Sequence, residues 1–271
     1  MQQNNPQQLQ IFQVDAFSQH CFQGNPASVV PLEEWLSDSC LQQIAAENNQ
    51  SETAFFVPLH SSTADFEIRW FTPTMEVKLC GHATLASAHV LKHHLDFGPE
   101  QVVFSSQSGP LKVNYRHQAI QLDFPATAIA EKIEGSLLDN VKAAIGSDVI
   151  HVYDSDYLIV RLADESQVLT VKPDFHAIAA LPRIGVIVTS QSADYDFVSR
   201  FFAPQAGINE DPVTGSAHCI LTPYWYQQTQ KTQFNAKQIS PRGGEVFCEL
   251  ADDRVLMTGQ AVTYLTGTIR I

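Results

Sequence analysis

The chain has few basic residues, no long apolar run and no clustered cysteines, and each shortage excludes a class of protein. Lysine and arginine together number 16, against 29 aspartates and glutamates, so the formal net charge is −13. A protein with this charge repels nucleic acid and anionic membranes, and we expect neither as a partner. No apolar stretch approaches the roughly 20 residues that span a bilayer. The Gln- and Asn-rich start also lacks a signal-peptide pattern, so a cytoplasmic protein is predicted.

The cysteines give no sign of a disulfide framework or of a metal site. They stand at positions 21, 40, 80, 219 and 248, and none has CxxC spacing. We therefore expect reduced thiols, most of them small core residues. The sequence also has no phosphate-binding loop and no cluster of metal ligands, so neither a metal nor an organic cofactor is expected.

What the chain does contain is an internal repeat. Residues 66–88 and 197–221 each run from an aromatic strand through Arg-aromatic-Phe-x-Pro and a short loop to a glycine that opens a helix of small residues. Gly81 in the first copy corresponds to Gly215 in the second. The N-terminus of a helix offers backbone N–H donors to anions. The repeat thus predicts two anion-binding pockets, which would face a shared cleft if the halves pack with pseudo-twofold symmetry.

Hydrophobic periodicity predicts a strand-rich chain with few helices. The helices are expected at about 32–49, 82–95, 136–145 and 216–228, the last kinked or broken by Pro223. Segment 125–132 is the expected linker between the two halves. Each half should then be a curved antiparallel sheet wrapped round one central helix.

Glu52 is the first candidate for chemistry. It lies where a predicted helix gives way to a strand, immediately before an apolar run. One interpretation is a solvated carboxylate in a loop. At the start of an apolar strand, however, the side chain would be partly desolvated, which raises its pKa and suits it to general acid and base catalysis.

His82 and Cys80 flank Gly81 at the start of the first central helix. The helix dipole disfavours imidazolium, so a neutral His82 could hydrogen-bond a ligand, although a purely local contact is the simpler alternative. Cys80 is either a buried small residue or a thiol activated by the helix start. His89 and His93 share roughly one helical face with His82, but His89 lies two turns away, so we expect no metal site there.

Asp211 and Ser216 lead into the second central helix. Helix capping alone could explain both residues, but it does not explain the near-copy at residues 79–84. The counterpart of Cys80 is Thr214, which is a poor base. A two-thiol proton relay is therefore not expected.

Five motifs together resemble the phenazine-biosynthesis (PhzF-like) isomerase family. They are Gln13-Val14-Asp15-Ala16-Phe17, Gly24-Asn25-Pro26, Ser51-Glu52-Thr53-Ala54-Phe55, Cys80-Gly81-His82-Ala83-Thr84-Leu85 and Asp211-Pro212-Val213-Thr214-Gly215-Ser216-Ala217. The resemblance covers nearly the whole chain from about residue 9. It implies the diaminopimelate-epimerase-like α+β fold, with two pseudo-symmetric lobes, each a β-barrel-like antiparallel sheet around a central helix, and an active site between them. We place the lobes at residues 9–124 and 133–261, with a strand at about 262–271 crossing back to the first.

The resemblance also implies an isomerase that needs no metal and no cofactor. By the family pattern, Glu52 abstracts and returns a proton, His82, Asp211 and Ser216 bind and assist the substrate, and the backbone at Gly81 and Gly215 holds its carboxylate. The epimerase relatives use a pair of cysteines, of which this chain keeps only Cys80. Cys80 is therefore at most a modulator of the site in this prediction.

The sequence thus predicts a cytoplasmic isomerase, expected as a homodimer, that acts on a small anionic metabolite bearing a carboxylate. Two alternatives stay open. One is a catalytically silent binding or interaction protein with the same fold, and the other is a racemase that depends on Cys80. The substrate cannot be read from the motifs, and neither can a link to phenazines, because pocket walls come from many separate loops.

Overall fold

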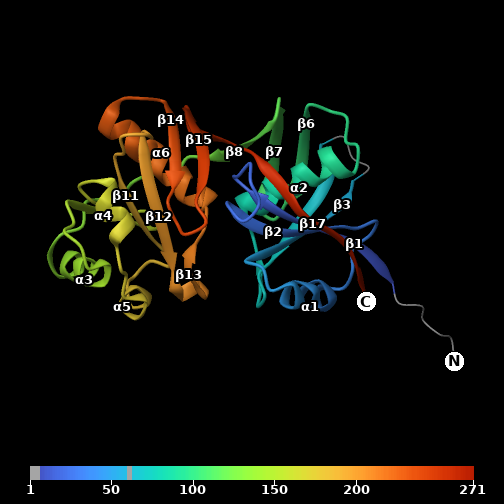
Figure 1. Ribbon diagram of the computed structural model, residues 1–271, viewed down its shortest axis with the longest axis horizontal. Helices are drawn as coiled ribbons and strands as arrows, with labels where there is room; N and C mark the ends of the chain where they lie inside the picture. The colour runs from blue at the N-terminus through green and yellow to red at the C-terminus, as the bar shows by residue number, and fades with distance from the viewer. Residues whose placement is uncertain (1–6, 60–62) are drawn as a thin grey trace. The chain divides into compact units, whose positions relative to one another are not determined.

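The computed structural model describes residues 7–59 and 63–271, and the chain divides into two compact units (Figure 1). Unit 1 consists of the described residues of Met1–Phe22, Pro26–Leu122 and Gly259–Ile271, and unit 2 of Gln23–Asn25 and Asp123–Thr258. Both units mix strands with fewer helices, as the predicted α+β class requires. No helix in the described part of the chain is long and apolar enough to cross a membrane.

Unit 1 is built on strands from both ends of the chain. Its elements are β1 (Gln8–Ala16), β2 (Asn25–Pro31), α1 (Asp38–Asn48), β3 (Glu52–Pro58), β4 (Phe66–Phe71), β5 (Glu76–Val77), α2 (Gly81–His94), β6 (Gln101–Ser106), β7 (Gly109–Arg116), β8 (Ala119–Pro125) and β17 (Ala261–Arg270). β17 runs antiparallel to β1 along nearly the full length of both strands. The last strand of the chain therefore closes the unit that the first strand begins.

Unit 2 contains the remaining elements. These are α3 (Gly135–Ile145), β9 (His151–Tyr153), β10 (Leu158–Arg161), α4 (Glu165–Thr170), α5 (Phe175–Ala179), β11 (Val186–Ser190), β12 (Phe197–Ala203), a 3-10 turn (Pro204–Ala206), β13 (Ile208–Asp211), α6 (Gly215–Thr229), β14 (Gln233–Gln238), β15 (Gly244–Ala251) and β16 (Arg254–Gly259). The apolar core of this unit lies between its sheet and α3, α4 and α5.

The strand pairings follow the same order in both units. In unit 1, β2 is parallel to β3, β3 antiparallel to β4, β4 parallel to β6, and β6 antiparallel to β7. In unit 2, β10, β11, β12, β14 and β15 repeat this pattern step for step. The sequence repeat thus corresponds to a structural repeat.

The sheets are mixed, so the prediction of purely antiparallel sheets was wrong. The reason lies in the connections. The chain passes from β2 to β3 through α1, and between β4 and β6 it passes through β5 and α2. A crossover of this kind returns the chain in its original direction, and the paired strands are then parallel.

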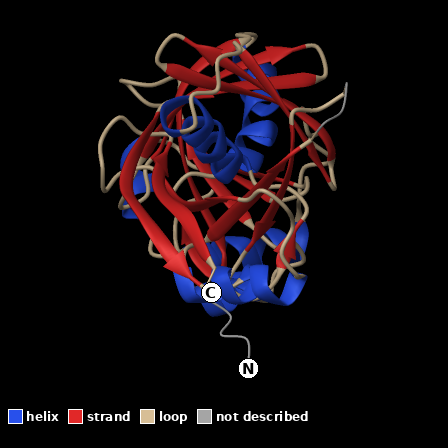
Figure 2. Ribbon diagram, turned by 90° about the vertical axis from the view of Figure 1, so that its right-hand side faces the viewer, coloured by secondary structure: helices blue, strands red, loops and turns tan. Residues whose placement is uncertain are grey.

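Each unit encloses one helix, as predicted. In unit 1, α2 contacts β1, β3 and β17 and is buried without interruption from His82 to Leu91. In unit 2, α6 is buried over most of its length and contacts β15. Figure 2 shows helical ribbon surrounded by strands. Each of these helices begins with small residues, Gly81 and Ala83 in α2 and Gly215 and Ala217 in α6.

Helix α6 runs unbroken through Pro223, so the predicted break does not occur. Proline lacks an N–H group and leaves the carbonyl of Cys219, four residues earlier, without its helical partner. The backbone N–H of Thr127 supplies the missing donor, with an N···O distance of 3.0 Å. Thr127 lies in the predicted linker, which is therefore hydrogen-bonded into unit 2 instead of forming a free connection.

The first helix starts six residues later than predicted. Ser37 caps α1 by accepting a hydrogen bond from the N–H of Cys40, and Asn49 ends the helix in the left-handed region. The segment before Ser37 is not helical, yet Leu32 still packs against α1 and β3 in an apolar cluster. The apolar residues of segment 32–49 do pack together, but the cap at Ser37 determines where the helix begins.

The packing of Phe17, just after β1, against Gly259, at the end of β16, can be tested with two glycine substitutions. A Cβ at Gly259 would overlap the ring of Phe17, which is 1% exposed, whereas a Cβ at Gly267 would lie 3.5 Å from its nearest neighbour, Leu265. We expect Gly259→Ala to lower the free energy of unfolding by about 1 to 3 kcal/mol through overpacking. The control Gly267→Ala should change it by no more than about 0.5 kcal/mol. Urea unfolding measures both, and equal effects would contradict this account of the junction.

Candidate active site

An arginine–glutamate pair in each unit holds the strand that leads to the enclosed helix. In unit 1, Arg69 donates from Nε and Nη2 to the two carboxylate oxygens of Glu76, at 2.7 and 2.8 Å. In unit 2, Arg200 makes the same paired contacts with Glu210, at 2.7 and 2.9 Å. Bidentate pairs of this kind fix orientation as well as distance. The repeated Arg-aromatic-Phe motif therefore positions both helix starts in the same way.

Glu52 is the first residue of β3, and only 14% of its side chain is exposed. Burial raises the pKa of Glu52 above its ordinary value of 4.5, and hydrogen bonds from Ser51 and Cys80 oppose part of that rise. The cause is the one expected from the sequence, because removing a carboxylate from water disfavours its charged form. Glu52 is thus a carboxyl group with increased proton affinity.

His82 joins Glu52 to Cys80. Its Nε2 atom lies 3.3 Å from Oε2 of Glu52 and 3.4 Å from Oγ of Ser51, and its Nδ1 atom lies 3.5 Å from Sγ of Cys80. The imidazole is 6% exposed. The structure therefore brings together three of the predicted residues, with Gly81 between two of them in the chain. A carboxyl, an imidazole and a thiol in this arrangement can accept, hold and pass a proton.

Glu52, Cys80 and His82 also each offer one donor atom within 4.8 Å of the others, a spacing that a metal ion could bridge. Hydrogen bonds among the three groups already account for their proximity, so we assign no metal. His89 and His93 do not join them. The rings of these two histidines contact each other at 4.5 Å, and Nε2 of His89 lies 2.9 Å from Oγ1 of Thr263.

Asp211 is buried in unit 2 and is held by hydrogen bonds to side chains from separate segments. Asn25 donates from Nδ2 to Oδ1 of Asp211 at 2.8 Å and to the carbonyl of Val213 at 2.9 Å. Thr214 donates its hydroxyl to the other carboxylate oxygen. Gln238 donates to the Asp211 carbonyl at 2.7 Å and accepts from the Thr214 N–H at 2.9 Å. The Asp211 carboxylate is therefore fixed in one orientation.

Helix capping does not account for Asp211 and Ser216. The N-cap residues of α2 and α6 are Cys80 and Thr214, and neither side chain caps its helix. Ser216 is exposed, and its hydroxyl lies 3.1 Å from the hydroxyl of Tyr157. A helix start without a side-chain cap suits the binding of an anion by backbone N–H groups.

Three residues around these positions were not predicted as site residues. Asn25 belongs to the Gly24-Asn25-Pro26 motif, which was the one available signal for it. Gln238 and Tyr157 lie 27 residues and 59 residues along the chain from their partners Asp211 and Ser216. No local pattern marks such residues, because only the folded sheet brings them into contact.

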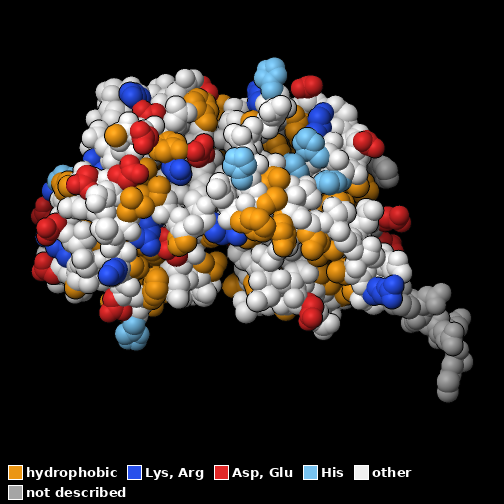
Figure 3. Space-filling model, in the orientation of Figure 1, with side chains coloured by type: hydrophobic (Ala, Val, Ile, Leu, Met, Phe, Trp, Pro, Cys, Tyr) orange, Lys and Arg blue, Asp and Glu red, His pale blue; other side chains and the backbone are white. Residues whose placement is uncertain are grey.

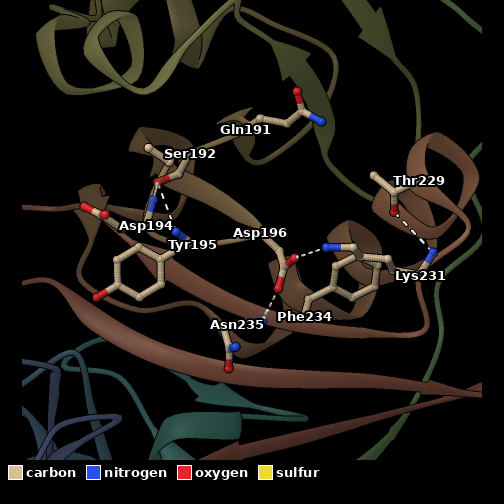
Figure 4. A pocket seen from close by; sticks show the side chains of 10 residues that line it. Gln191, Ser192, Asp194, Tyr195, Asp196, Thr229, Lys231, Phe234 and Asn235 are labelled. Carbon is tan, nitrogen blue, oxygen red and sulfur yellow. Dashed lines mark hydrogen bonds and ion pairs between the residues drawn. The ribbon is translucent and has the colours of Figure 1, made fainter.

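A surface hollow of about 620 Å³ in unit 2 contains none of the predicted residues (Figure 4). Its wall includes the loop after β11, the end of α6 and the start of β14. Asp196 binds Nζ of Lys231 at 2.8 Å and the N–H of Asn235 at 2.8 Å. Since these charges already have partners, the hollow is not assigned a function.

Comparison with known proteins agrees with the motifs. A family model described as phenazine biosynthesis-like protein matches residues 14–267. A Pseudomonas aeruginosa protein named as an uncharacterized isomerase is 49% identical over 265 residues, which cover 97% of this chain and 99% of that protein.

Solved structures show the same relationship. A PhzF-family crystal structure from Enterococcus faecalis has a TM-score of 0.93 and 43% identity, and the match covers 98% of this chain and all of that one. A hydroxyproline epimerase from Agrobacterium vitis shares the fold, with a TM-score of 0.63, 11% identity and coverage of 97% and 93%. The chain therefore belongs to the phenazine biosynthesis-like, or PhzF, family.

Proposed function

We propose that this protein isomerises a small carboxylate-bearing metabolite by removing a proton and returning it at another position, with Glu52 as the proton carrier. The observation that supports the proposal most strongly is the state of Glu52. It is a largely buried carboxyl group with a raised pKa, in contact with an imidazole and a thiol. Acids and bases that work near neutral pH commonly have pKa values displaced in this direction.

The proton balance is closed within the site. Ionised Glu52 accepts a proton from a substrate C–H bond, and the electron pair of that bond passes into the substrate. Burial stabilises the neutral Glu52 that results. Its carboxyl proton exchanges with solvent, and a proton then passes from Glu52 to a different carbon. His82 can hydrogen-bond the substrate while its ring is held against Cys80. No external acid, base or oxidant is consumed.

The remaining residues are proposed to bind substrate. Backbone N–H groups at Gly81 and Gly215 would hold a carboxylate, and Asp211 and Ser216 would make side-chain contacts. We further propose a cytoplasmic homodimer that needs no cofactor and binds neither nucleic acid nor membrane. The net charge of −13 supports the absence of nucleic acid and membrane as partners. Charged side chains of both signs are interspersed on the face in Figure 3.

The first prediction concerns the rate of proton exchange. Glu52→Gln keeps the shape of the side chain but removes the base, so deuterium incorporation from solvent should fall about 10²- to 10⁴-fold. The measurement is mass spectrometry of candidate carboxylates and a metabolite extract incubated with enzyme in D₂O.

Cys80→Ser is the matched comparison, and it should retain most of the exchange. If exchange depends on Cys80 and survives in Glu52→Gln, the protein is instead a Cys80-dependent racemase. If the wild-type protein binds a metabolite but exchanges no hydrogen, it is a binding protein.

The second prediction concerns stability. Because the pKa of Glu52 is raised in the folded state, that state binds the proton more tightly than the unfolded chain does. This contribution to stability is fully present below about pH 4.5 and is lost as the pH rises through the folded-state pKa. Glutamine does not ionise, so Glu52→Gln should gain stability relative to wild type between pH 4 and pH 7. Urea unfolding at both pH values tests this, with the exposed Glu47→Gln as control.

The third prediction concerns the helix start in unit 2. Gly215 is buried and does not have a positive φ, so valine there acts by blocking the approach to the backbone and not by straining it. Gly215→Val should weaken the binding of small carboxylates at least about tenfold. The exposed Asp194→Lys should leave it unchanged. Calorimetric titration of both folded variants measures the affinity. Undiminished binding by Gly215→Val would contradict the proposal that the start of α6 binds a carboxylate.

A further inference from the structure

Arg161, the last residue of β10, differs from most other arginines of the chain. Four arginines form ion pairs with carboxylates, namely Arg69, Arg183, Arg200 and Arg254. Among the described residues, the side chain of Arg161 has no ion pair and no hydrogen bond, and its Nη1 atom is buried without a partner. A buried donor without a partner is rare in native proteins and calls for an explanation, such as a bound water or ion.

The guanidinium of Arg161 lies on an aromatic platform. Its central carbon is 4.6 Å from the ring centroid of Trp225 in α6. The indole N–H of Trp225 donates to Oγ1 of Thr189 at 3.2 Å, and Thr189 is the β11 neighbour of Arg161 in the sheet. The hydrogen bond to Thr189 therefore fixes the orientation of the indole ring. Stacking orients the plane of the guanidinium but satisfies none of its N–H groups.

A second unsatisfied group lies on the same face. His151 of β9 is the direct cross-strand partner of Arg161, so the two side chains project from the same side of the sheet. The Nδ1 atom of His151 is also buried without a partner. The rings of Tyr153 and Tyr224 contact each other at 5.8 Å, and Tyr153 contacts His151 at 6.2 Å. Two adjacent nitrogen groups thus lack partners inside an aromatic surround.

The electrostatics also favour an external anion. Burial lowers the pKa of Arg161, and the one neighbouring group that opposes this effect is the phenol of Tyr224. The cation is thus desolvated without a carboxylate nearby, in a chain with 29 acidic residues. Arg161 and His151 are both only partly buried, so part of each residue is open to solvent.

We propose that Arg161 and His151 form a binding site for a small oxyanion, a carboxylate or a phosphate group, stacked beside Trp225. Arginine binds both groups through two parallel hydrogen bonds, which the unpartnered Nη1 would complete. Trp225 follows Gly215 by ten residues, or about 15 Å along α6. This site is therefore separate from the helix start in the proposed function and does not depend on it.

The test measures the binding of inorganic phosphate and of acetate by calorimetry, and by the change in tryptophan fluorescence, at constant ionic strength. Wild-type protein should bind at least one of them. Arg161→Met keeps a long side chain over the indole but removes the charge, and it should weaken binding at least about tenfold. Arg161→Lys retains the charge without the fork and should give an intermediate affinity. His151→Phe should also weaken binding.

Arg183→Met is the matched control, because Arg183 is an arginine of the same unit whose partner, Asp154, is known. It should bind both anions as wild type does. Thermal melting in phosphate and in chloride shows whether each variant is folded, and the conservative Arg161→Lys keeps the test valid if Arg161→Met is unfolded. Absence of binding to wild type, or equal binding by wild type, Arg161→Lys and Arg161→Met, would overturn the proposal. Preference for phosphate over acetate would identify which group the site takes.

Discussion

The direction in which each enclosed helix begins is fixed by its own N-cap residue and by the strand before it, and much of this structure follows from that constraint. The side chain of Thr84 donates to the carbonyl of Cys80 at 2.6 Å, and Nδ1 of His218 lies 2.8 Å from the carbonyl of Thr214. Both contacts bind the first turn back to its own N-cap residue. With the arginine–glutamate pairs before each helix, they keep the two helix starts rigid while leaving them without side-chain caps.

That rigidity matters for the proposed chemistry, because the same short segment positions several groups. Cys80, Gly81 and His82 are consecutive, so an ordered first turn of α2 places thiol, backbone N–H and imidazole at once. Glu52 comes from a different strand and meets them with a raised pKa. Proteins commonly accept such a desolvated carboxyl group at functional sites although it reduces stability. The site therefore combines a rigid segment, residues 80–82, with a buried carboxyl group, Glu52, whose charged form is disfavoured.

The sequence predicted those parts of the structure that depend on local pattern. The repeat and the two enclosed helices follow from the local pattern of the residues, whereas the grouping of Glu52 with His82 followed from the resemblance to the PhzF-like family. Strands β2 and β14 carry Asn25 and Gln238, whose contacts with Asp211 no local pattern marks. A kink or break at Pro223 was predicted in α6, and the break does not occur; the donor that compensates the proline comes from Thr127, far away in sequence. Contacts between segments that are far apart in the sequence leave no local signal, and the sequence analysis therefore did not predict them.

The pairing of β1 with β17 has a consequence for synthesis on the ribosome. The chain emerges from its N-terminus, so β1 is exposed to the cell while more than two hundred further residues are still being added. Its partner β17 follows every other strand of the structure in chain order. Unit 2 is continuous apart from Gln23–Asn25 and can be synthesised before β17. Unit 1 can close only after β17 has been synthesised, and until then the edge of β1 that β17 covers is open to association with other chains or to chaperones.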